Sequence, residues 1–218
     1  MTHPLRLLPA ALLVALALPQ IAEAAAPQGY GAVLRWYRQQ AEAGDAEAQF
    51  MLALQYEEGV RGGEPDIGEA LRWYRAAAEN GHALAQFRLA LLLQAQSHAG
   101  ARAEAVRWLT AAAEQGLADA QYNLAIALEM GIGTDRDEAG AIRWYRAAAE
   151  QGMPAAMYNL GGLLATGSNA PRDDVEAWAW LERAARAGVA GAADLRDRLA
   201  ARMTPAMIAE ARAQADGQ

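Results

Sequence analysis

The residues that could do chemistry on a substrate are few in this sequence. It has no cysteine and no lysine, which removes two common nucleophiles, and serine occurs only at Ser97 and Ser168. Ser97 directly precedes His98, but a catalytic nucleophile and its base are brought together in space, with a third group that orients the base. We therefore interpret this pair as part of a loop and predict that the chain is not an enzyme and has no catalytic residue.

The sequence predicts no metal or cofactor site either. The three histidines are His3, His82 and His98, and widely spaced histidines without thiols do not make a zinc site. A phosphate-binding loop of the Gly-x-x-x-x-Gly-Lys type needs a lysine. The acidic stretch TDRDE at residues 134–138 lacks the alternating oxygen ligands and the distal glutamate of a calcium loop. It is better explained as the start of a helix.

The elements that would position any site are repeats. The string RWYRAAAENG at residues 72–81 returns as RWYRAAAEQG at residues 143–152, and weaker copies lie between and beside them. A fixed period of this length indicates a solenoid, in which each unit buries its apolar face against its neighbours. The residues in register, at intervals of 35 to 37, are Trp36, Trp73, Trp108, Trp144 and Trp180, followed by Gly44, Gly81, Gly116, Gly152 and Gly188.

Each repeat is predicted to be two antiparallel helices. In residues 118–152, a first helix with apolar residues at helical spacing ends at the turn residues Gly131 and Gly133. Asp137 then provides an N-cap for the second helix, which ends at Gly152. The middle repeat lacks both the aspartate and the glycine turn, so we expect its connection over residues 97–102 to be irregular. The recurring caps are Asp66, Asp137 and Asp173.

Columns of small and apolar residues predict the core between these helices. Small residues let helix axes approach closely, and the tryptophans fill the space between layers. The columns of the first helix are Ala48, Ala85, Ala120 and Ala156, and Leu52, Leu89, Leu124 and Leu160. Those of the second helix are Ala70, Ala105, Ala141 and Ala177, and Ala77, Ala112, Ala148 and Ala184.

The N-terminal segment predicts export. A short polar start with Arg6 precedes an apolar run over residues 7–18, and Ala22-Glu23-Ala24 is a small-x-small cleavage pattern, so residues 1–24 are predicted to be a signal peptide. An uncleaved anchor is the alternative, but the run is shorter than the roughly 20 residues of a spanning helix. We expect a periplasmic or secreted protein of a Gram-negative bacterium. The net charge of −7 disfavours nucleic acid and anionic lipid as partners.

These repeats resemble the Sel1-like repeat, a relative of the tetratricopeptide repeat. The resemblance rests on Ala-x-x-x-Leu followed by Gly-x-Gly, and then on Asp-x-x-x-Ala-x-x-Trp-Tyr-x-x-Ala-Ala-x-x-Gly. It implies an all-α fold, a right-handed α-α superhelix of helical hairpins over residues 25–188. The repeats would span a partial unit at 30–44 and then about 45–80, 82–115, 117–151 and 153–187. Residues 189–218 are expected to cap the end, with Thr204 as N-cap and Pro205 as first residue of a final helix.

The resemblance also implies a function. It predicts a non-catalytic scaffold that binds another protein or peptide, in envelope assembly or in the regulation of signalling, without a cofactor and without stable membrane insertion once the signal is removed. The alternative is a hydrolase acting on β-lactam or cell-wall-related substrates, as suggested for cysteine-rich Sel1-like proteins. Those proteins carry a disulfide in each repeat, and this chain has no cysteine.

The first helix of each repeat is predicted to line the partner-binding face. If Leu52 and Tyr56 point into the stack, the opposite side of that helix presents an aromatic column flanked by carboxylates. The alternative is that the aromatic side chains pack between repeats, and the carboxylates are expected to be exposed in either case. The candidate partner-binding residues are Glu47, Phe50, Glu57, Phe87, Gln94, Asp119, Tyr122, Glu129 and Tyr158.

Further polar residues recur beside these columns. The arginines next to the tryptophans are expected to pair with Glu79, Glu114 and Glu150 along helix surfaces, rather than to form a basic stripe for a ligand. Asn123 and Asn159 are expected to hydrogen-bond backbone groups between helices. The arginines are Arg35, Arg38, Arg72, Arg75, Arg143 and Arg146.

Overall fold

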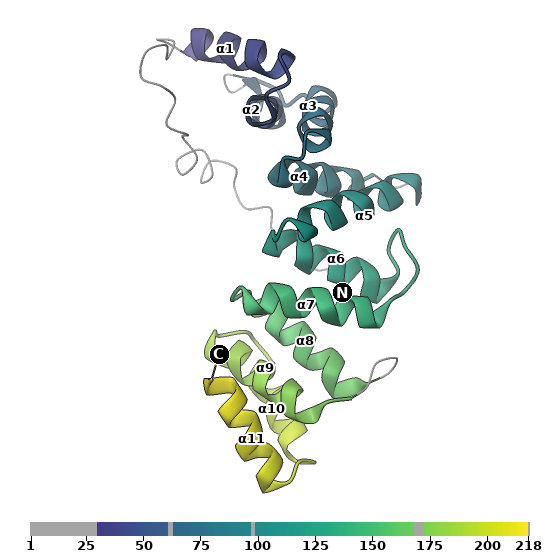
Figure 1. Ribbon diagram of the computed structural model, residues 1–218, viewed down its shortest axis with the longest axis vertical. Helices are drawn as coiled ribbons and strands as arrows, with labels where there is room; N and C mark the ends of the chain where they lie inside the picture. The colour runs from purple at the N-terminus through teal and green to yellow at the C-terminus, as the bar shows by residue number, and fades with distance from the viewer. Residues whose placement is uncertain (1–29, 61–62, 97–98, 168–171, 218) are drawn as a thin grey trace. The chain divides into compact units, whose positions relative to one another are not determined.

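The computed structural model describes residues 30–60, 63–96, 99–167 and 172–217, and every regular element within them is an α-helix (Figure 1). None of these described helices combines the length and the apolar character needed to cross a bilayer. The predicted signal peptide and the residues Ser97, His98 and Ser168 lie outside the described residues. The helices are α1 (Tyr30–Glu42), α2 (Ala46–Glu58), α3 (Ile67–Glu79), α4 (Ala83–Gln94), α5 (Ala99–Glu114), α6 (Ala118–Met130), α7 (Glu138–Glu150), α8 (Pro154–Thr166), α9 (Asp174–Arg186), α10 (Ala192–Ala200) and α11 (Pro205–Asp216).

The helices belong to two compact units, Met1–Leu89 and Ala90–Gln218, and the division lies within α4. In the first unit, α2 packs against both α1 and α3. In the second unit, each helix from α5 to α9 packs against the next along the chain, and α9 also contacts α10 and α11 (Figure 1). The prediction of an all-α fold made of helical hairpins is confirmed.

Three second helices begin at the predicted aspartates. The carboxylates of Asp66, Asp137 and Asp173 each accept a hydrogen bond from the backbone N–H three residues further on, at 2.8–3.0 Å. The backbone N–H of Asp137 also donates to the carbonyl of Leu128 in α6 at 2.9 Å, and the other two aspartates donate to the preceding helix in the same way. Each aspartate therefore sets the start of the second helix and ties it to the end of the first.

The turn between α6 and α7 requires both predicted glycines. Gly131 ends α6 in the left-handed conformation, with φ 67° and ψ 37°. Gly133 has a φ of 74°, and a Cβ at this position would lie 2.4 Å from the carbonyl oxygen of Arg102 in α5. A side chain at residue 133 is therefore excluded both by the backbone conformation and by the contact with α5. The glycines predicted to follow the second helices all have positive φ: Gly44, Gly81, Gly116, Gly152 and Gly188.

The alanine and leucine columns form the core, as predicted. All 16 residues of these four columns are at most 2% exposed. Trp73 and Trp180 are buried with them, whereas Trp36, Trp108 and Trp144 are half-buried. The packing of the repeats therefore depends on small residues that bring the helices close and on larger leucine and tryptophan side chains that fill the space between them.

Side-chain amides link consecutive repeats. Gln49 in α2 donates to a carbonyl at the end of α1 at 3.0 Å, and its Oε1 accepts a hydrogen bond from Asn80 at 2.9 Å. In the second unit, Gln121 donates to a carbonyl at the end of α5 at 3.2 Å and accepts from Gln151 at 2.8 Å. Asn80 and Gln151 occupy the one position at which the two near-identical strings differ, and both make the same contact.

The middle repeat differs from the prediction. The sequence predicts an irregular connection over residues 97–102, but α5 begins at Ala99 and includes Ala101 and Arg102. Alanine is the strongest helix former, and Ala101 is 1% exposed, so packing and propensity together keep this segment helical without an aspartate cap.

The predicted final helix is α11. The side chain of Thr204 accepts a hydrogen bond from the backbone N–H of Met207, and Pro205 is the first residue of the helix. Ala211 and Ala215 are buried, and the helix packs on α9. The final helix therefore covers a face of α9, which is consistent with a capping role.

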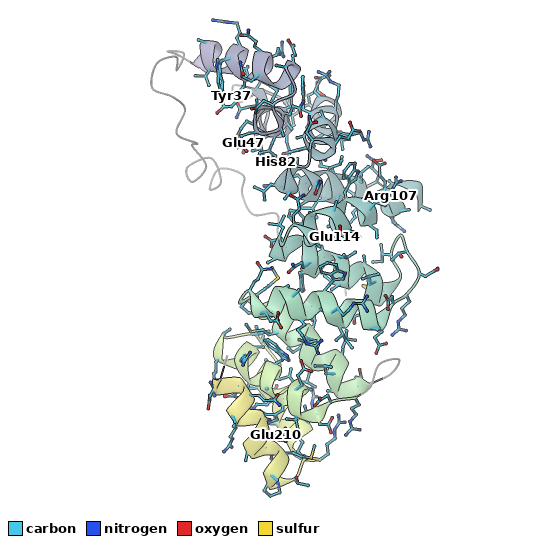
Figure 2. All side chains as sticks on the ribbon, in the orientation of Figure 1. Tyr37, Glu47, His82, Arg107, Glu114 and Glu210 are labelled. Carbon is cyan, nitrogen blue, oxygen red and sulfur yellow. The ribbon has the colours of Figure 1, made fainter. Side chains whose placement is uncertain are left out.

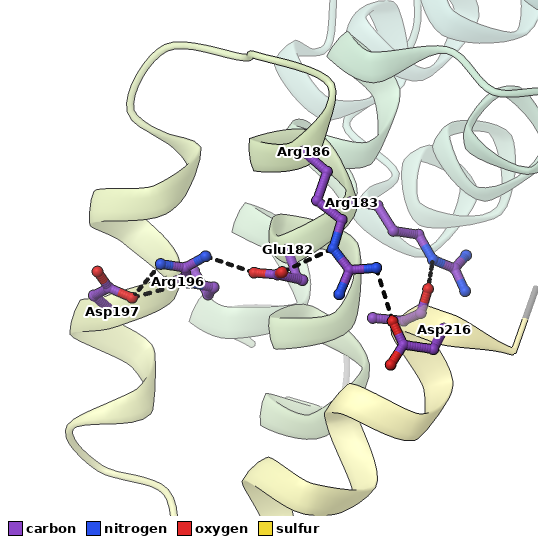
Figure 3. A network of polar contacts seen from close by, with 7 residues as sticks. Glu182, Arg183, Arg186, Arg196, Asp197 and Asp216 are labelled. Carbon is purple, nitrogen blue, oxygen red and sulfur yellow. Dashed lines mark hydrogen bonds and ion pairs between the residues drawn. The ribbon is translucent and has the colours of Figure 1, made fainter.

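Polar contacts also hold α9 to α10 and α11 (Figure 3). Glu182 of α9 pairs with Arg196 of α10 at 2.5 Å. On the other side of α9, Arg186 pairs with Asp216 at 2.7 Å, and Arg183 donates to the carbonyl of the buried residue 215 at 3.2 Å. Burial lowers the pKa of Arg183, and the nearby charge of Arg186 lowers it further.

Candidate partner-binding face

The nine candidate residues lie on the first helices of the repeats, and they differ in burial. Phe50 is 4% exposed, with its ring centroid 5.9 Å from that of Tyr74 and 4.5 Å from that of His82. The sequence left open whether the aromatic column lines a binding groove or packs between repeats. Phe50 packs between helices. The other eight are half-buried: Glu47, Glu57, Phe87, Gln94, Asp119, Tyr122, Glu129 and Tyr158. A binding role for these residues stays a prediction.

The expectation that all flanking carboxylates are exposed is wrong for Glu57. One of its oxygens accepts a hydrogen bond from the hydroxyl of Tyr74 in α3, and the other lies 4.0 Å from Nη1 of Arg88 in α4. The side chains of Glu57 and Arg88 are only 19% and 9% exposed. The carboxylate is enclosed because a second-helix tyrosine and a first-helix arginine both reach it.

Glu129 in the second unit has a similar environment. Its Oε2 accepts a hydrogen bond from the hydroxyl of Tyr145 in α7 at 2.7 Å, and the ring of Tyr145 lies 5.7 Å from that of Tyr122. Asn159 of α8 donates to the hydroxyl of Tyr122 at 3.4 Å. Burial raises the pKa of Tyr145 far above its ordinary value, and the hydrogen bond to Glu129 raises it further. Tyr145 is therefore a neutral hydrogen-bond donor.

These tyrosine–glutamate pairs were not predicted, although the sequence contains a signal for them. Among the four complete repeats, the residue after the tryptophan is tyrosine in two, and in both the first helix has a glutamate at the matching position near its end. The two repeats with leucine there have an uncharged residue instead. The pairs are Glu57 with Tyr74, Gln94 with Leu109, Glu129 with Tyr145, and Ala165 with Leu181. Comparing two columns, rather than one, would have found the contact.

A second cluster in the first unit involves His82 and Glu47, which lie close together in Figure 2. Nδ1 of His82 accepts a hydrogen bond from the backbone N–H of Ala85 at 3.1 Å, so the proton is on Nε2, which lies 3.0 Å from Glu47. Burial raises the pKa of Tyr37, and the charge of Glu47 adds to this shift. His82 thus serves as the N-cap of α4, and Glu47 holds the imidazole in place.

An apolar strip in the second unit remains open. Tyr122, Ile126 and Met130 follow one another at intervals of four residues on α6, so they share a face, and Met130 is 66% exposed. Tyr158 and Gly162 share a face of α8, and no atom lies within 4 Å of the place that a Cβ would occupy at Gly162. We name these five residues the α6–α8 strip. Its half-buried members pack against the core, and its exposed end is free to contact a partner.

Two of these arginines, Arg72 and Arg146, have other partners than predicted. Arg72 pairs with Glu69 of its own helix at 2.8 Å, and Arg146 of α7 makes a two-pronged contact with Glu176 of α9 at 2.9 Å. The predicted partners Glu79, Glu114 and Glu150 are one or more turns further along and are exposed. Asn123 bonds to a carbonyl of its own helix rather than to a neighbouring one.

A metal site and a ligand-binding cleft are the two other kinds of site that the remaining polar groups of the described residues could form. Within residues 30–60, 63–96, 99–167 and 172–217, no group of three or more histidine, aspartate or glutamate side chains is arranged to hold a metal ion. A cleft of about 380 Å³ is lined by Ala149, Glu150, Gly152, Met157 and Arg183. Because Arg183 already binds α11, this cleft contains no uncommitted cationic group for a ligand.

Comparisons with known proteins agree with this architecture. The family model described as Sel1 repeat matches residues 46–82, 83–117, 118–153 and 154–189. No curated protein matches the chain.

Two solved structures are similar over most of the chain. One is a protective antigen present in uropathogenic Escherichia coli strains that displays an SLR fold: it is 33% identical, with a TM-score of 0.72 over 88% of this chain and 41% of that chain. The other is a Sel1 repeat protein from Oxalobacter formigenes, 30% identical, with a TM-score of 0.67 over 85% of this chain and 78% of that chain. This chain thus spans less than half the length of the first of these relatives.

The family match covers four consecutive helical hairpins, and the two structures extend the likeness to the fold as a whole. Both findings confirm the all-α solenoid class that the repeats predict. The chain belongs to the Sel1 repeat family.

Proposed function

We propose that this chain is a scaffold without catalytic activity that binds another protein or peptide through the first helices of its repeats. Membership of the Sel1 repeat family supports an interaction role. The observation that carries the proposal is the α6–α8 strip, in which Met130 is 66% exposed and the surface above Gly162 is open. One exposed apolar side chain in line with half-buried ones at helical spacing suits the apolar side chains of a partner.

The proposal includes export. Residues 1–24 have the pattern of a cleavable signal, and the partner would then be a periplasmic or extracellular protein in envelope assembly or signalling. Sequencing the N-terminus of the protein from the envelope fraction tests this. The mature chain should begin at Ala25, and an intact N-terminus would contradict the proposal.

A hydrolase remains the alternative, but no observation on the described residues favours it. The tyrosine and glutamate side chains that lie together are engaged in structural hydrogen bonds. Turnover of nitrocefin by the purified protein would overturn the scaffold proposal, and we expect none.

Site-specific photocrosslinking in living cells tests the binding face. A photoreactive residue would replace Met130, which is 66% exposed on a first helix, or Arg143, whose side chain is 69% exposed on a second helix. Because the two sites are equally accessible, chance encounters should label both alike. We expect a discrete adduct from residue 130 only. Equal adducts from both sites, or an adduct from residue 143 alone, would place the partner elsewhere.

A further inference from the structure

The two enclosed glutamates differ in one contact. Oε2 of each accepts a hydrogen bond from a tyrosine of the second helix. Oε1 of Glu57 faces the guanidinium of Arg88 at 4.0 Å. For Oε1 of Glu129, the described residues provide no hydrogen bond and no ion pair.

Whether a guanidinium lies near the glutamate depends on one residue in the first helix of the following repeat. Arg88 and Asn159 hold the same place in their repeats, each three residues after the column alanine, at Ala85 and Ala156. The guanidinium that neutralises Glu57 is therefore replaced by an uncharged amide beside Glu129. In the repeat between them the carboxylate is absent as well, since Gln94 stands at the glutamate position and Asn123 at the arginine position. Of these three described positions, Glu129 alone is a glutamate with no arginine at the matching place on the following first helix.

The surroundings of Glu129 suit a cation. The hydroxyl of Tyr122 and the amide of Asn159 lie together at the same place, joined by a hydrogen bond of 3.4 Å, and both contain oxygen acceptors. The ring of Tyr122 offers an aromatic face of the kind on which a guanidinium stacks. Glu129, Tyr122 and Asn159 are half-buried, so water screens the carboxylate less than it would on an open surface.

We infer that Glu129, Tyr122 and Asn159 form a binding site for an arginine side chain of the partner, which supplies from outside the guanidinium that Arg88 supplies internally in the first unit. The site adjoins the α6–α8 strip, so a partner segment could place an apolar side chain above Gly162 and an arginine at Glu129. This inference rests on the proposed function and makes it specific, because it names the chemistry that the partner must present.

A titration followed by NMR tests the site directly. The chain, expressed with its own leader and isotopically labelled, would be titrated with N-acetyl-arginine methylamide, and with the citrulline analogue, which has nearly the same shape but no charge. We expect saturable shifts of the Asn159 side-chain amide and the Glu129 carboxyl carbon, with a Kd in the millimolar range, from the arginine probe only. Equal shifts from citrulline, or no saturable shift from arginine, would overturn the inference.

Two variants with the same change in net charge distinguish binding of the arginine probe at Glu129 from its general attraction to an acidic protein. Glu129→Gln removes the carboxylate of the site, and Glu114→Gln removes an exposed carboxylate on α5. Binding of the arginine probe should be about fivefold weaker or more in Glu129→Gln than in Glu114→Gln. Equal affinities in the two variants would show that the attraction is not local to Glu129.

A third measurement needs no ligand. Asn159→Arg places a guanidinium where Arg88 has one, and Asn159→Met provides a side chain of similar length without charge. The unfolding equilibrium constant of Asn159→Arg should be about threefold smaller than that of Asn159→Met, and the difference should vanish in a Glu129→Gln background. An unchanged difference in that background would mean that the site does not recognise a guanidinium.

These results can be told apart from a failure of the proposed function. If the adduct from residue 130 forms but neither the probe nor the variants depend on Glu129, the partner binds the strip without an arginine and only the present inference is wrong. If no adduct forms, the proposed function fails, whatever the probe does.

Discussion

The hydroxyl of Tyr145 donates a hydrogen bond to Glu129, and this bond gives the glutamate a structural role. Tyr145 is fully buried, and it donates to Glu129 at 2.7 Å. Tyr74 makes the same contact with Glu57 in the first unit. The sequence predicted Glu129 as an exposed residue for binding a partner. One of its carboxylate oxygens instead stabilises the fold, and only the other oxygen is available for binding.

Removing this hydroxyl should destabilise the protein moderately. Tyr145→Phe keeps the ring in the core but deletes the donor, so Glu129 loses one charged hydrogen bond. We expect the free energy of unfolding to fall by about 1–2 kcal/mol, as measured by urea denaturation. Tyr122→Phe is the matched control, since Tyr122 is only half-buried and the hydrogen bond between its hydroxyl and Asn159 is 3.4 Å long. A smaller loss for Tyr145→Phe than for this control would contradict the assignment.

The same tyrosines predict how stability changes at alkaline pH. Burial, and then the neighbouring glutamates, raise the pKa of both Tyr74 and Tyr145 above the ordinary value of 10.0. Because the folded pKa is raised, the stabilisation is complete below pH 10 and is lost as the pH rises above it, when the unfolded chain releases the protons first. The free energy of unfolding should fall by about 1.4 kcal/mol per pH unit for each tyrosine.

This slope can be checked by urea denaturation between about pH 10 and pH 12. Tyr145→Phe should reduce the slope for the second unit, because one raised tyrosine is removed. Parallel pH profiles for the wild type and the variant would show that Tyr145 titrates normally.

At the scale of helices, the sequence predicted the features that recur in most or all of the repeats. The aspartate caps, the glycines after the second helices and the alanine columns are set by backbone conformation and close approach, which restrict residue type strongly. The start of α5 was not predicted, because the sequence has Ala101 where the other repeats have the capping aspartate, and alanine itself favours a helix. The enclosure of Glu57 was not predicted either, since it depends on Tyr74 and Arg88 in two other helices.

Replacing either of two adjacent glycines in α8 with alanine should change the free energy of unfolding in opposite directions. A Cβ at Gly161 would lie 2.7 Å from Cγ of Leu181 and 3.0 Å from the carbonyl oxygen of Ala177 in α9, whereas a Cβ at Gly162 would meet nothing within 4 Å. Gly161→Ala should lower the free energy of unfolding by about 1–3 kcal/mol, through overpacking. Gly162→Ala should raise it by about 0.4–1 kcal/mol, because alanine lowers the entropy of the unfolded chain.

Thermal unfolding of the two variants, measured side by side by circular dichroism, decides this prediction. If both substitutions shift the melting temperature in the same direction, the close contact between α8 and α9 is wrong.

At the scale of the whole molecule, function depends on how the repeats differ rather than on how they agree. Recurring contacts, such as those of Gln49 with Asn80 and of Gln121 with Gln151, hold neighbouring repeats together. The repeats then differ at a few buried or half-buried positions, among them Arg88, Asn123 and Asn159. The resemblance to the family predicts the contacts that recur between repeats well. It predicts the proposed binding residues poorly, because they lie where this chain departs from the shared repeat pattern.

The C-terminal helix should be needed for a stable, monodisperse protein. Deleting residues 204–218 removes α11, together with the contacts that Arg183 and Arg186 make with it, and uncovers a face of α9. We expect a loss of about 2–5 kcal/mol in the free energy of unfolding, and self-association in size-exclusion chromatography with light scattering. Deleting only residues 217–218 keeps Asp216 and serves as the control. A truncated chain as stable and as dispersed as this control would contradict a capping role for α11.

The central claim is that the first helices of the second unit are the working surface of this protein. Hydrogen–deuterium exchange, with and without the partner recovered through the adduct at residue 130, tests it most directly. Binding should slow exchange in Ala118–Met130 and Pro154–Thr166, with little change in Glu138–Glu150. Slower exchange confined to Glu138–Glu150 or to Asp174–Arg186 would show that the partner binds the second helices and would contradict the account.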